Sequence, residues 1–315
     1  LKIFLPISNS EIQKKNVVHT LNKKLLFAHL AILGANLIYA INYGFAKDVM
    51  NGGYVPPFTF ILFRGIGATF LFWITSLFFY EKISKSDLLK FALCGLFGVT
   101  ANQLMFFNGL ELTSTIHASI IMVTSPIIVS VLSVIILKEK LRLTKVLGVL
   151  IGLAGAITII FQNKSGAGNS GLIGDLLIFL NATSFGLYLI LVKPLMSKYS
   201  PITVAKWVFT FGLIGVIPFG LYEIDEVNWN MGNDIIMKIG FVILFTTYLC
   251  YLFNIYGIKY VSPTVVSTYI YLQPVLTSVI AVLSGREEIE FVSVLCSLII
   301  FGGVYLVSIN TNKIN

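Results

Sequence analysis

The sequence predicts an all-α membrane protein with ten transmembrane helices, arranged as two inverted five-helix repeats. Three observations predict this fold. Of the 315 residues, 57% are apolar and only 11% are charged, whereas a soluble domain is roughly half apolar and a quarter charged. The apolar residues gather in runs about as long as a bilayer is thick. The second half of the chain also repeats the first, with the charges of its connections reversed.

Ten apolar runs are close to the ~20 residues that a helix needs to cross the hydrocarbon layer. Because that layer holds no water to satisfy the backbone, each run is expected to be helical. The period-two alternation of a β-barrel is absent. The runs lie at about 25–46, 57–79, 88–108, 114–137, 143–161, 172–192, 203–222, 237–256, 264–283 and 291–309.

The segments follow one another in a simple order. Residues 1–24 are polar and carry lysines, and we expect a cytoplasmic N-terminal segment followed by a retained first helix. The first five-helix repeat is expected at 25–161. The Gly- and Ser-rich stretch 162–171 is predicted to be an external linker. The second repeat is expected at 172–309, and 310–315 form a cytoplasmic tail.

The two halves align at a constant offset of 148 residues. The aligned pairs are Leu104 with Leu252, Gly109 with Gly257, Ser114 with Ser262, Pro126 with Pro274 and Gly155 with Gly303. The connection with Lys138 and Lys140 aligns with one that carries Glu287 and Glu288. An odd number of spans per repeat makes the second copy enter from the opposite side, so equivalent connections exchange charge.

The basic residues set the orientation. With the N-terminus inside, 17 of them lie in or next to cytoplasmic connections and 4 on the outer side, so both termini are expected in the cytoplasm. We expect a multi-pass protein of the plasma (inner) membrane. The net charge of +8 comes from these helix ends, so no nucleic-acid partner is expected.

Neither a cofactor nor a metal is expected. Cys94, Cys250 and Cys296 lie within apolar spans without metal-type spacing, and we interpret them as buried apolar thiols. HExxH, GxSxG, P-loop and CxxC motifs are absent. The chain is therefore not expected to be an enzyme, nor to hydrolyse ATP by itself.

Several motifs recur in the same order in both halves. Each half has a Pro at the start of its second helix, a Pro within its fourth, a Glu after the fourth and a Gly-rich fifth. The residues are Pro57, Arg64, Pro126, Glu139, Gly148, Gly152 and Gly155, then Pro201, Pro274, Glu287, Gly302 and Gly303. Over about 25–309 the chain resembles the EamA family of the drug/metabolite transporter superfamily. This resemblance implies ten helices, a central cavity and alternating access, mostly for efflux of small metabolites.

Arg64 is the clearest candidate site residue. It lies about seven residues into the second span, ~10 Å below the outer surface, where a charged side chain is costly. One interpretation is that it attracts a carboxylate or phosphate of the substrate. The alternative is that it extends outward to the interface or pairs with helix ends.

The third, fourth, eighth and ninth spans carry matched polar positions at helical spacing. We expect them to line a cavity, with interhelical hydrogen bonding as the alternative. Pro126 and Pro274 should each free the carbonyl four residues earlier, near the membrane midplane. The candidate residues are Gln103, Ser125, Tyr251, Asn254 and Gln273.

The first and sixth spans carry a similar set with the same two interpretations. These candidates are Asn36 and Tyr39 in the first span and Asn181 and Tyr188 in the sixth. Asp175 is the only acid within any predicted span, and it lies near the outer end. Without a carboxylate near a midplane, we expect uncoupled export or coupling through a group not yet identified.

The sequence therefore predicts a secondary transporter that moves a small, amino-acid-like metabolite out across the plasma membrane. Its partners would be the small-molecule substrate and the lipid bilayer. The glycines of the fifth and tenth spans indicate close helix packing, with a homodimer seam as the alternative. A lipid or nucleotide-sugar translocator is the main rival. An integral-membrane lipid-modifying enzyme is less favoured, because its possible groups, Arg64, Asp175 and His29, lie on different sides.

Overall fold

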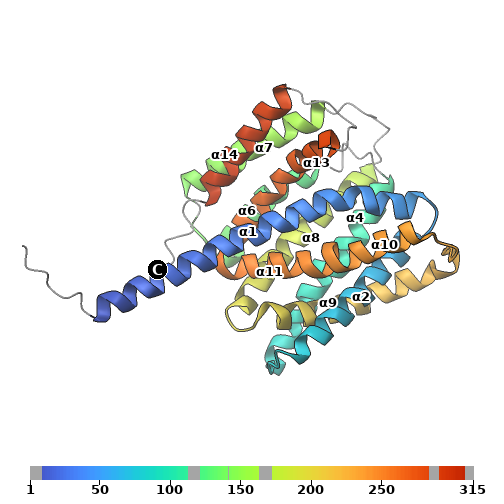
Figure 1. Ribbon diagram of the computed structural model, residues 1–315, viewed down its shortest axis with the longest axis horizontal. Coiled ribbons are helices and arrows are strands. Elements are labelled where there is room, and N and C mark those ends of the chain that lie inside the picture. Colours follow the sequence, from blue (N-terminus) through green and yellow to red (C-terminus); the bar gives the residue numbers. More distant parts are fainter. Residues whose placement is uncertain (1–8, 113–120, 141, 163–171, 284–290, 309–315) are drawn as a thin grey trace, which may run out of the picture.

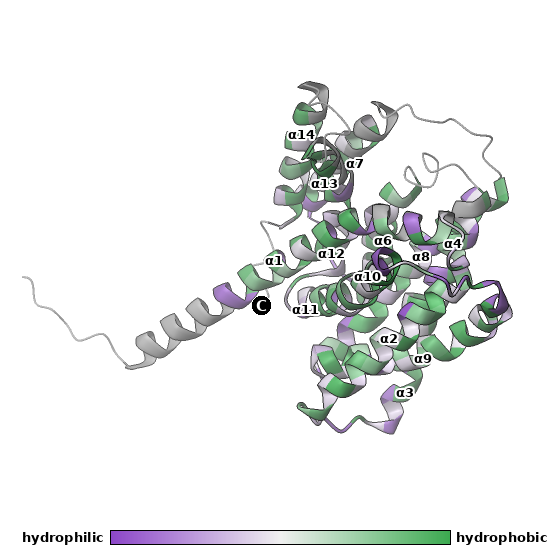
Figure 2. Cartoon of the chain, turned by 45° about the vertical axis from the view of Figure 1, so that its right-hand side comes forward, coloured by the Kyte–Doolittle hydropathy of each residue, from purple (hydrophilic) through white to green (hydrophobic). Residues whose placement is uncertain are grey.

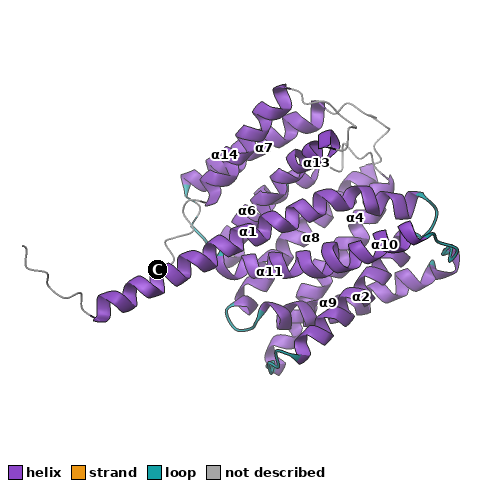
Figure 3. Ribbon diagram, in the orientation of Figure 1, coloured by secondary structure: helices purple, strands orange, loops and turns teal. Residues whose placement is uncertain are grey.

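The computed structural model describes residues 9–112, 121–140, 142–162, 172–283 and 291–308, and these contain helices and no strand (Figure 3). The first half holds α1 (Asn9–Asn51), α2 (Pro57–Leu77), α3 (Leu88–Gly95), α4 (Ala101–Leu112), α6 (Ser125–Leu137) and α7 (Leu143–Gln162). The second half holds α8 (Leu172–Met196), α9 (Pro201–Tyr222), α10 (Asn233–Phe241), α11 (Cys250–Tyr260), α12 (Pro263–Thr268), α13 (Leu272–Leu283) and α14 (Phe291–Ser308).

Short segments of other helical types connect some of these helices. Three are 3₁₀ turns: η1 (Lys85–Asp87), η3 (Ile224–Glu226) and η5 (Tyr269–Tyr271). Two are π-helical: η2 (Leu96–Thr100) and η4 (Val242–Leu249). Each π segment continues without a break into α-helix on both sides, so α3–η2–α4 and α10–η4–α11 are two long, locally widened helices.

Six helices in the described part of the chain are long and apolar enough to cross a membrane. They cover Asn22–Asn42, Pro57–Leu77, Lys85–Gly109, Leu172–Met196, Pro201–Tyr222 and Asn233–Tyr260. Shorter apolar helices at Ile121–Leu137, Leu143–Gly155 and Val294–Ser308 fall on predicted spans. The predicted span 264–283 is divided among α12, η5 and α13.

Helix α1 is longer than the sequence analysis expects. It begins at Asn9 and runs for 43 residues, a length of about 64 Å at ~1.5 Å per residue. The expected polar segment 1–24 is thus largely helical, because no Pro or Gly interrupts the chain between Asn9 and the first apolar run. Figure 1 shows this end of α1 extending beyond the other helices.

Helices of the two halves pack on one another in corresponding pairs. Helix α2 packs along α9, and α7 packs along α14. Helix α4 packs on α8 as α1 packs on α11. Figure 1 shows α7 beside α14 and α2 beside α9. The two halves therefore form one bundle. In it α2 and α7 pack on their counterparts α9 and α14, and the contact of α4 with α8 matches that of α11 with α1.

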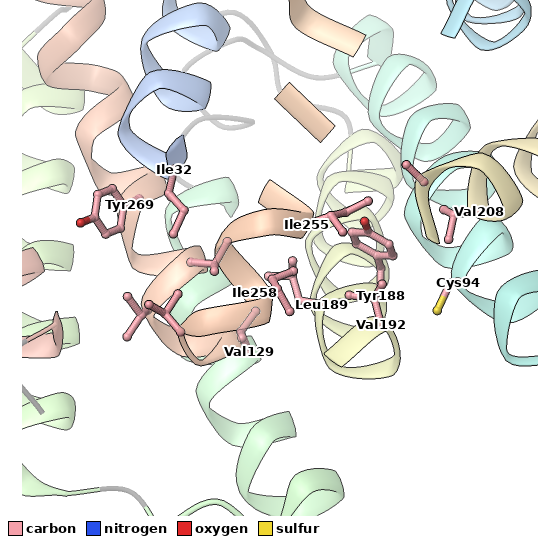
Figure 4. Close-up of a cluster of buried hydrophobic side chains, with 14 of the residues drawn as sticks. Ile32, Cys94, Val129, Tyr188, Leu189, Val192, Val208, Ile255, Ile258 and Tyr269 are labelled. Atoms are coloured by element: carbon pink, nitrogen blue, oxygen red, sulfur yellow. The ribbon is translucent and has the colours of Figure 1, made fainter. Parts of the chain in front are cut away.

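The core of this bundle draws side chains from both halves. Ile32, Cys94 and Val129 of the first half lie in the same buried cluster as Tyr188 and Ile255 of the second (Figure 4). All three cysteines are buried and unbonded, as expected: Cys94, Cys250 and Cys296. The interior is thus a shared apolar core, and polar groups within it need a specific explanation.

Glycines bring α7 and α14 close together within the chain. A Cβ placed on Gly148 would lie 2.7 Å from the Gly303 carbonyl oxygen, and one on Gly303 would lie 2.6 Å from the Gly152 nitrogen. Small residues allow this backbone approach. Gly302 faces open space instead, with no atom within 4 Å. The glycine motif therefore serves intramolecular packing, which is the favoured interpretation of the sequence analysis.

Many large apolar side chains are exposed on the outside of the bundle, and Figure 2 shows that apolar residues predominate along its helices. Large side chains stand exposed on helices of both halves, including Phe70 at 64% and Leu298 at 64%. Exposed apolar surface costs roughly 25 cal/mol per Å² in water, and soluble monomers rarely present it continuously. Such a surface is the one that a lipid environment requires.

The fourth and ninth predicted spans are each interrupted next to their proline, while the freeing of the carbonyl four residues before each proline stays a prediction. Helix α6 begins at Ser125, with Pro126 in its first turn, after an irregular turn at Thr124. The Thr124 backbone nitrogen and hydroxyl both donate to the Ile121 carbonyl, at 3.0 and 2.6 Å. In the second half, η5 lies directly before the helix that contains Pro274. Each proline therefore begins a new helical segment inside an apolar run.

Two glutamates close the opposite ends of the α2–α9 pair. At one end, the Ser200 backbone nitrogen donates to Glu81 Oε2 at 2.9 Å, which caps α9. At the other end, the Phe58 backbone nitrogen donates to Glu223 Oε2 at 3.1 Å, at the start of α2. A carboxylate at a helix N-terminus satisfies free N–H groups and complements the helix dipole. The pair is thus held at both ends by equivalent contacts.

Candidate functional site

The buried cation Arg64 is at the centre of the candidate site. It lies on α2 and is only 8% exposed. Its Nε donates to Thr247 Oγ1 at 3.0 Å, and its Cζ lies 5.9 Å from the centre of the Phe60 ring. In the part of the chain that the structure describes, no carboxylate lies within ion-pair distance of Arg64.

Thr247 holds Arg64 from the π segment η4. Its hydroxyl accepts the Arg64 bond and donates to the Val242 carbonyl at 2.9 Å. The donated bond spans five residues, as the wider turn of a π helix allows. Both functions of the hydroxyl are used, so the guanidinium is fixed at its Nε edge.

Helix α1 brings Tyr39 to the same region. The Asn254 side chain donates to the Tyr39 hydroxyl at 3.3 Å and to the Cys250 carbonyl at 2.9 Å. Tyr39, Cys250 and Tyr251 all lie within electrostatic range of Arg64. Residues 247, 250, 251 and 254 follow helical spacing, so η4 and α11 present one polar face to Arg64.

Tyr251 connects this face to the first half of the chain. Its hydroxyl donates to the Gly98 carbonyl in η2 at 2.9 Å, and the Gln103 side chain lies close to the same hydroxyl. The Phe209 ring packs edge-on against Tyr251, with the ring centres 4.6 Å apart. We call Tyr39, Arg64, Gln103, Thr247, Tyr251 and Asn254 the Arg64 cluster. It draws on both halves of the chain.

Tyr188 lies at the margin of this cluster. Its ring centre is 6.5 Å from that of Tyr251, and its hydroxyl is buried without a hydrogen-bond partner among the described residues. A Cβ on Gly98 would lie only 2.4 Å from the Tyr188 ring. Glycine at position 98 therefore lets the ring pack directly on the π segment (Tyr188 is labelled in Figure 4).

Asn36 and Gln273 form a second polar contact one helical turn from Tyr39. Gln273 Nε2 donates to Asn36 Oδ1 at 3.0 Å, and Asn36 Nδ2 donates to the Ile32 carbonyl at 2.8 Å. Asn36 is 3% exposed. This contact joins α1 to α13, directly after the broken segment η5. Two more predicted residues are therefore brought together, beside the Arg64 cluster.

The last two predicted residues, Ser125 and Asn181, make no hydrogen bond to the Arg64 cluster in the described part of the chain. Asn181 on α8 donates to the Asn102 carbonyl on α4, which is the interhelical bonding that the sequence analysis gives as its alternative. Ser125 is fully buried, and its hydroxyl has no hydrogen-bond partner among residues with described positions. A role for Ser125 and Asn181 in lining a cavity stays a prediction.

Thr247, the residue that positions Arg64, is not among the site residues predicted from the sequence. Its signal is nevertheless present: Thr246 and Thr247 are adjacent hydroxyls in an apolar run, and Thr247 lies four residues before Tyr251. Thr246 also contributes, because its hydroxyl donates to Asn42 Oδ1 at 3.1 Å. The unpredictable part is the π turn, which shifts the face on which these hydroxyls lie.

The arrangement favours binding over catalysis. Two tyrosines lie near one cation and each has an amide side chain beside it, and the cluster lacks the nucleophile–base pair that covalent chemistry needs. His29, on a different stretch of α1, has its Nδ1 2.8 Å from the Tyr269 hydroxyl. Within the described ranges, no three His, Cys, Asp or Glu residues gather as a metal site would require.

An apolar groove lies on the flank of the bundle between α1, α9 and α11. It has no charged side chain in its lining, so it offers little for recognition of a polar solute. Its residues are Phe27, Ala31, Pro201, Ile202, Leu252, Phe253 and Tyr256.

Known proteins with similar sequences cover nearly the whole chain. The uncharacterized transporter YyaM of Bacillus subtilis is 28% identical over 289 residues, covering 89% of this chain and 93% of YyaM. An uncharacterized transporter of Archaeoglobus fulgidus is 26% identical, covering 88% of this chain and 96% of its own. The WAT1-related protein At3g53210 of Arabidopsis thaliana is 25% identical, covering 89% and 84%.

The fold also has a counterpart among solved structures. The crystal structure of one other protein superposes on this chain with a TM-score of 0.75 at 18% identity, and the match covers 91% of this chain and 98% of that chain. The model of the EamA-like transporter family matches twice, at residues 26–161 and 172–309. Together with the apolar helices, these matches identify a multi-pass membrane protein and a transporter rather than an enzyme. The chain belongs to the EamA-like transporter family.

Proposed function

We propose that the protein is a secondary transporter that moves a small, amino-acid-like metabolite out of the cell by alternating access. The observation that carries this proposal is the Arg64 cluster, a buried polar set built by helices of both halves. Polar groups inside a membrane protein are costly and mark substrate pathways. A site at the junction of two repeats is accessible to either side when the halves rock against each other.

Ten membrane-spanning helices in two inverted repeats are part of this proposal. The domain limits are those of the sequence analysis, 25–161 and 172–309, with a linker at 162–171. The corresponding packing of α2 on α9 and of α7 on α14 supports a two-fold relation between the halves. Equivalent π segments in α3–η2–α4 and α10–η4–α11 support it further.

The proposed location is the plasma membrane, with both termini in the cytoplasm. The support is the bias of basic residues toward one set of connections. Labelling single cysteines at Lys140 and Glu288 from each side of the membrane tests the inversion. The two positions should label from opposite sides, and labelling from the same side would refute the inverted repeat.

Transport is best tested by counterflow in proteoliposomes. A thermal-shift screen against amino acids, nucleosides and sugars first selects solutes that stabilise the purified protein, because a ligand that binds the folded state raises its stability. Selected solutes should then exchange across the membrane. Binding without exchange would argue against a transporter function for this site.

A lipid or nucleotide-sugar translocator remains the alternative function. The apolar groove between α1, α9 and α11 is the observation that favours it, since such a surface suits an acyl chain. Replacing Ala31 with Trp would fill the groove without changing the Arg64 cluster. Loss of lipid movement with unchanged solute exchange would favour the translocator, and the small-metabolite proposal expects solute exchange with no lipid movement.

A homodimer likewise stays a prediction, tested by the mass of the purified protein in detergent.

A further inference from the structure

Arg64 differs from Lys193 and Lys238, two partly buried cations of this protein, because it lacks their strong acceptors among the described residues. Lys193 donates to the carbonyls of Ile258 and Val261, the latter at 2.7 Å. Lys238 pairs with Asp48 and Asp234 at 2.9 and 2.7 Å. Arg64 is more than nine-tenths buried, and one neutral hydroxyl receives its only hydrogen bond to a described residue.

The single bond of Arg64 leaves its guanidinium ready for a further acceptor. Its Nε is engaged by Thr247, and no described residue accepts a hydrogen bond from either terminal amino group. A guanidinium presents five donors in a planar fork that matches two carboxylate oxygens. A buried cation without a counter-charge is strongly destabilising, so its retention here needs an acceptor that the described residues do not provide.

The neighbours of Arg64 suit the ligand that would provide this acceptor. Tyr39 and Tyr251 offer phenol groups near the cation, and Asn254 adds an amide bonded to the Tyr39 hydroxyl. The Phe60 ring lies 5.9 Å away. Aromatic rings around a fixed donor group are typical of sites for small metabolites. A carboxylate at Arg64 would place the rest of such a solute among these side chains.

We propose that Arg64 is the subsite for the carboxylate of the transported solute, held in register by Thr247. This inference rests on the proposed function and narrows it to solutes that carry a carboxylate. The carboxylate accepts hydrogen bonds from the terminal amino groups of Arg64, while Thr247 keeps the Nε edge from rotating. No bond is made or broken in the solute.

The chemistry of arginine gives a direct test. The chain has three arginines, Arg64, Arg142 and Arg286, and phenylglyoxal modification of each is resolved by peptide mass spectrometry. The probes are matched acids and amides at equal concentration: butyrate and butyramide, benzoate and benzamide, L-leucine and L-leucinamide. Inorganic phosphate is included as a second anion. Arg142 and Arg286 serve as internal controls in every sample.

The expected result is that phenylglyoxal reaches Arg64 in the folded protein and that at least one acid slows this reaction. Its amide should need an about tenfold higher concentration for the same protection, because bonds to charged acceptors are the stronger ones. The rates at Arg142 and Arg286 should not change. The Thr247→Val variant should keep the reaction at Arg64 but lose roughly threefold in protection, since the cation remains while its orientation loosens.

Four outcomes would overturn the inference. They are no reaction at Arg64 until the protein is unfolded, equal protection by acid and amide, protection by none of the acids, and protection by phosphate alone. The last would indicate a phosphate ester in place of a carboxylate. Because the readout is binding, it is independent of flux. If an acid protects Arg64 but the protein exchanges no solute, the carboxylate subsite stands and the proposed transport function is refuted.

Discussion

The two π segments occupy equivalent places in the two halves, yet their free carbonyls are satisfied in different ways. In η2, Ser184 of α8 donates to the Phe97 carbonyl at 2.8 Å and Tyr251 of α11 donates to the Gly98 carbonyl at 2.9 Å. In η4, the bond to the Val242 carbonyl comes from Thr247 within the same segment. The carbonyls of the first segment are bonded by other helices, whereas the Val242 carbonyl of the second is bonded within its own segment. The side chains of η4 still bond to other helices, Thr246 to Asn42 of α1 and Tyr248 to Thr75 of α2.

This difference assigns different tasks to equivalent backbone. Because η2 takes bonds from α8 and α11, and Thr100 donates to the Gly212 carbonyl of α9, it is a junction of helices. In η4 the Thr247 hydroxyl donates its proton to the Val242 carbonyl. Its oxygen can therefore accept the hydrogen bond from Arg64 and orient the guanidinium. A duplicated fold can therefore be symmetric in its backbone and asymmetric in its chemistry. We expect substitutions at η2 to alter stability and substitutions at η4 to alter substrate affinity.

The largest expected effect is at Arg64. We predict that Arg64→Gln lowers kcat/KM for a carboxylate solute by about 100-fold, because a buried charge-assisted pair is lost. Counterflow in proteoliposomes measures it at matched protein content. Lys206→Gln is the control. Lys206 lies 4.5 Å from the centre of the Trp73 ring, and this contact involves no residue of the Arg64 cluster. Wild-type rates in the Arg64 variant would show that Arg64, which η4 orients through Thr247, does not bind a group of the substrate.

The next effect concerns stability at η2. Gly98→Ala places a methyl group 2.4 Å from the Tyr188 ring, and we predict a loss of about 1–3 kcal/mol from overpacking. Thermal unfolding followed by tryptophan fluorescence measures it as a lower Tm. Gly240→Ala is the control, because a Cβ at that position meets no atom within 4 Å. Equal Tm values for the two variants would contradict the close packing of Tyr188 on η2.

A matched pair of hydroxyl deletions compares the segments directly. Ser184→Ala removes the donor to the Phe97 carbonyl of η2 and should cost about 0.6 kcal/mol of stability, an average value for such bonds in membranes. Thr247→Val removes the hydroxyl that orients Arg64 and should raise KM for a carboxylate solute about threefold with little change in Tm. Tm and KM are measured for both. Similar changes in both variants would remove the distinction between η2 and η4.

Much of this comparison could be predicted from the sequence, because the underlying signal is periodic. The apolar runs, the offset that pairs Pro126 with Pro274 and the burial of Arg64 follow from hydrophobicity and duplication. Tyr39, Gln103, Tyr251 and Asn254 were identified by helical spacing, and the structure gathers them around Arg64. Long, strongly patterned features depend little on local geometry.

The features that sequence reasoning missed depend on backbone irregularity. A π turn inserts one residue into the helical period and rotates everything that follows, so Thr247 could not be placed opposite Arg64 by counting. The extension of α1 to Asn9 is not predicted, because the apolar run that defines the first span begins only at residue 25. Asn181 illustrates a third difficulty: a buried amide suits both a cavity and a helix contact, and only the bond to the Asn102 carbonyl distinguishes them.

A smaller effect is expected at the cap formed by Glu81. Burial acts to raise the pKa of this carboxyl, but hydrogen bonds from Thr203 and Ser200 outweigh it and leave the pKa below its usual value. A lowered pKa in the folded state stabilises the protein above the ordinary pKa of Glu, and this stabilisation is lost as the pH falls through the folded value. We predict that Glu81→Gln reduces the loss of Tm between pH 7 and pH 4. An unchanged pH profile would show that the cap carries no charge-dependent stability.

The smallest predicted effect is that of a proton gradient on transport. Asp175 is the only acid in any predicted span, and it lies in the first turn of α8. The Arg64 cluster contains phenols, amides, a hydroxyl and a guanidinium, none of which exchanges a proton readily near pH 7. Uptake into vesicles that hold a proton gradient should therefore change less than about twofold when a protonophore collapses the gradient, because coupling needs a group that titrates during the cycle. A collapse of transport would instead assign the proton to a group outside the cluster. In that case His29, bonded to Tyr269 on the broken segment η5, is the first residue to replace.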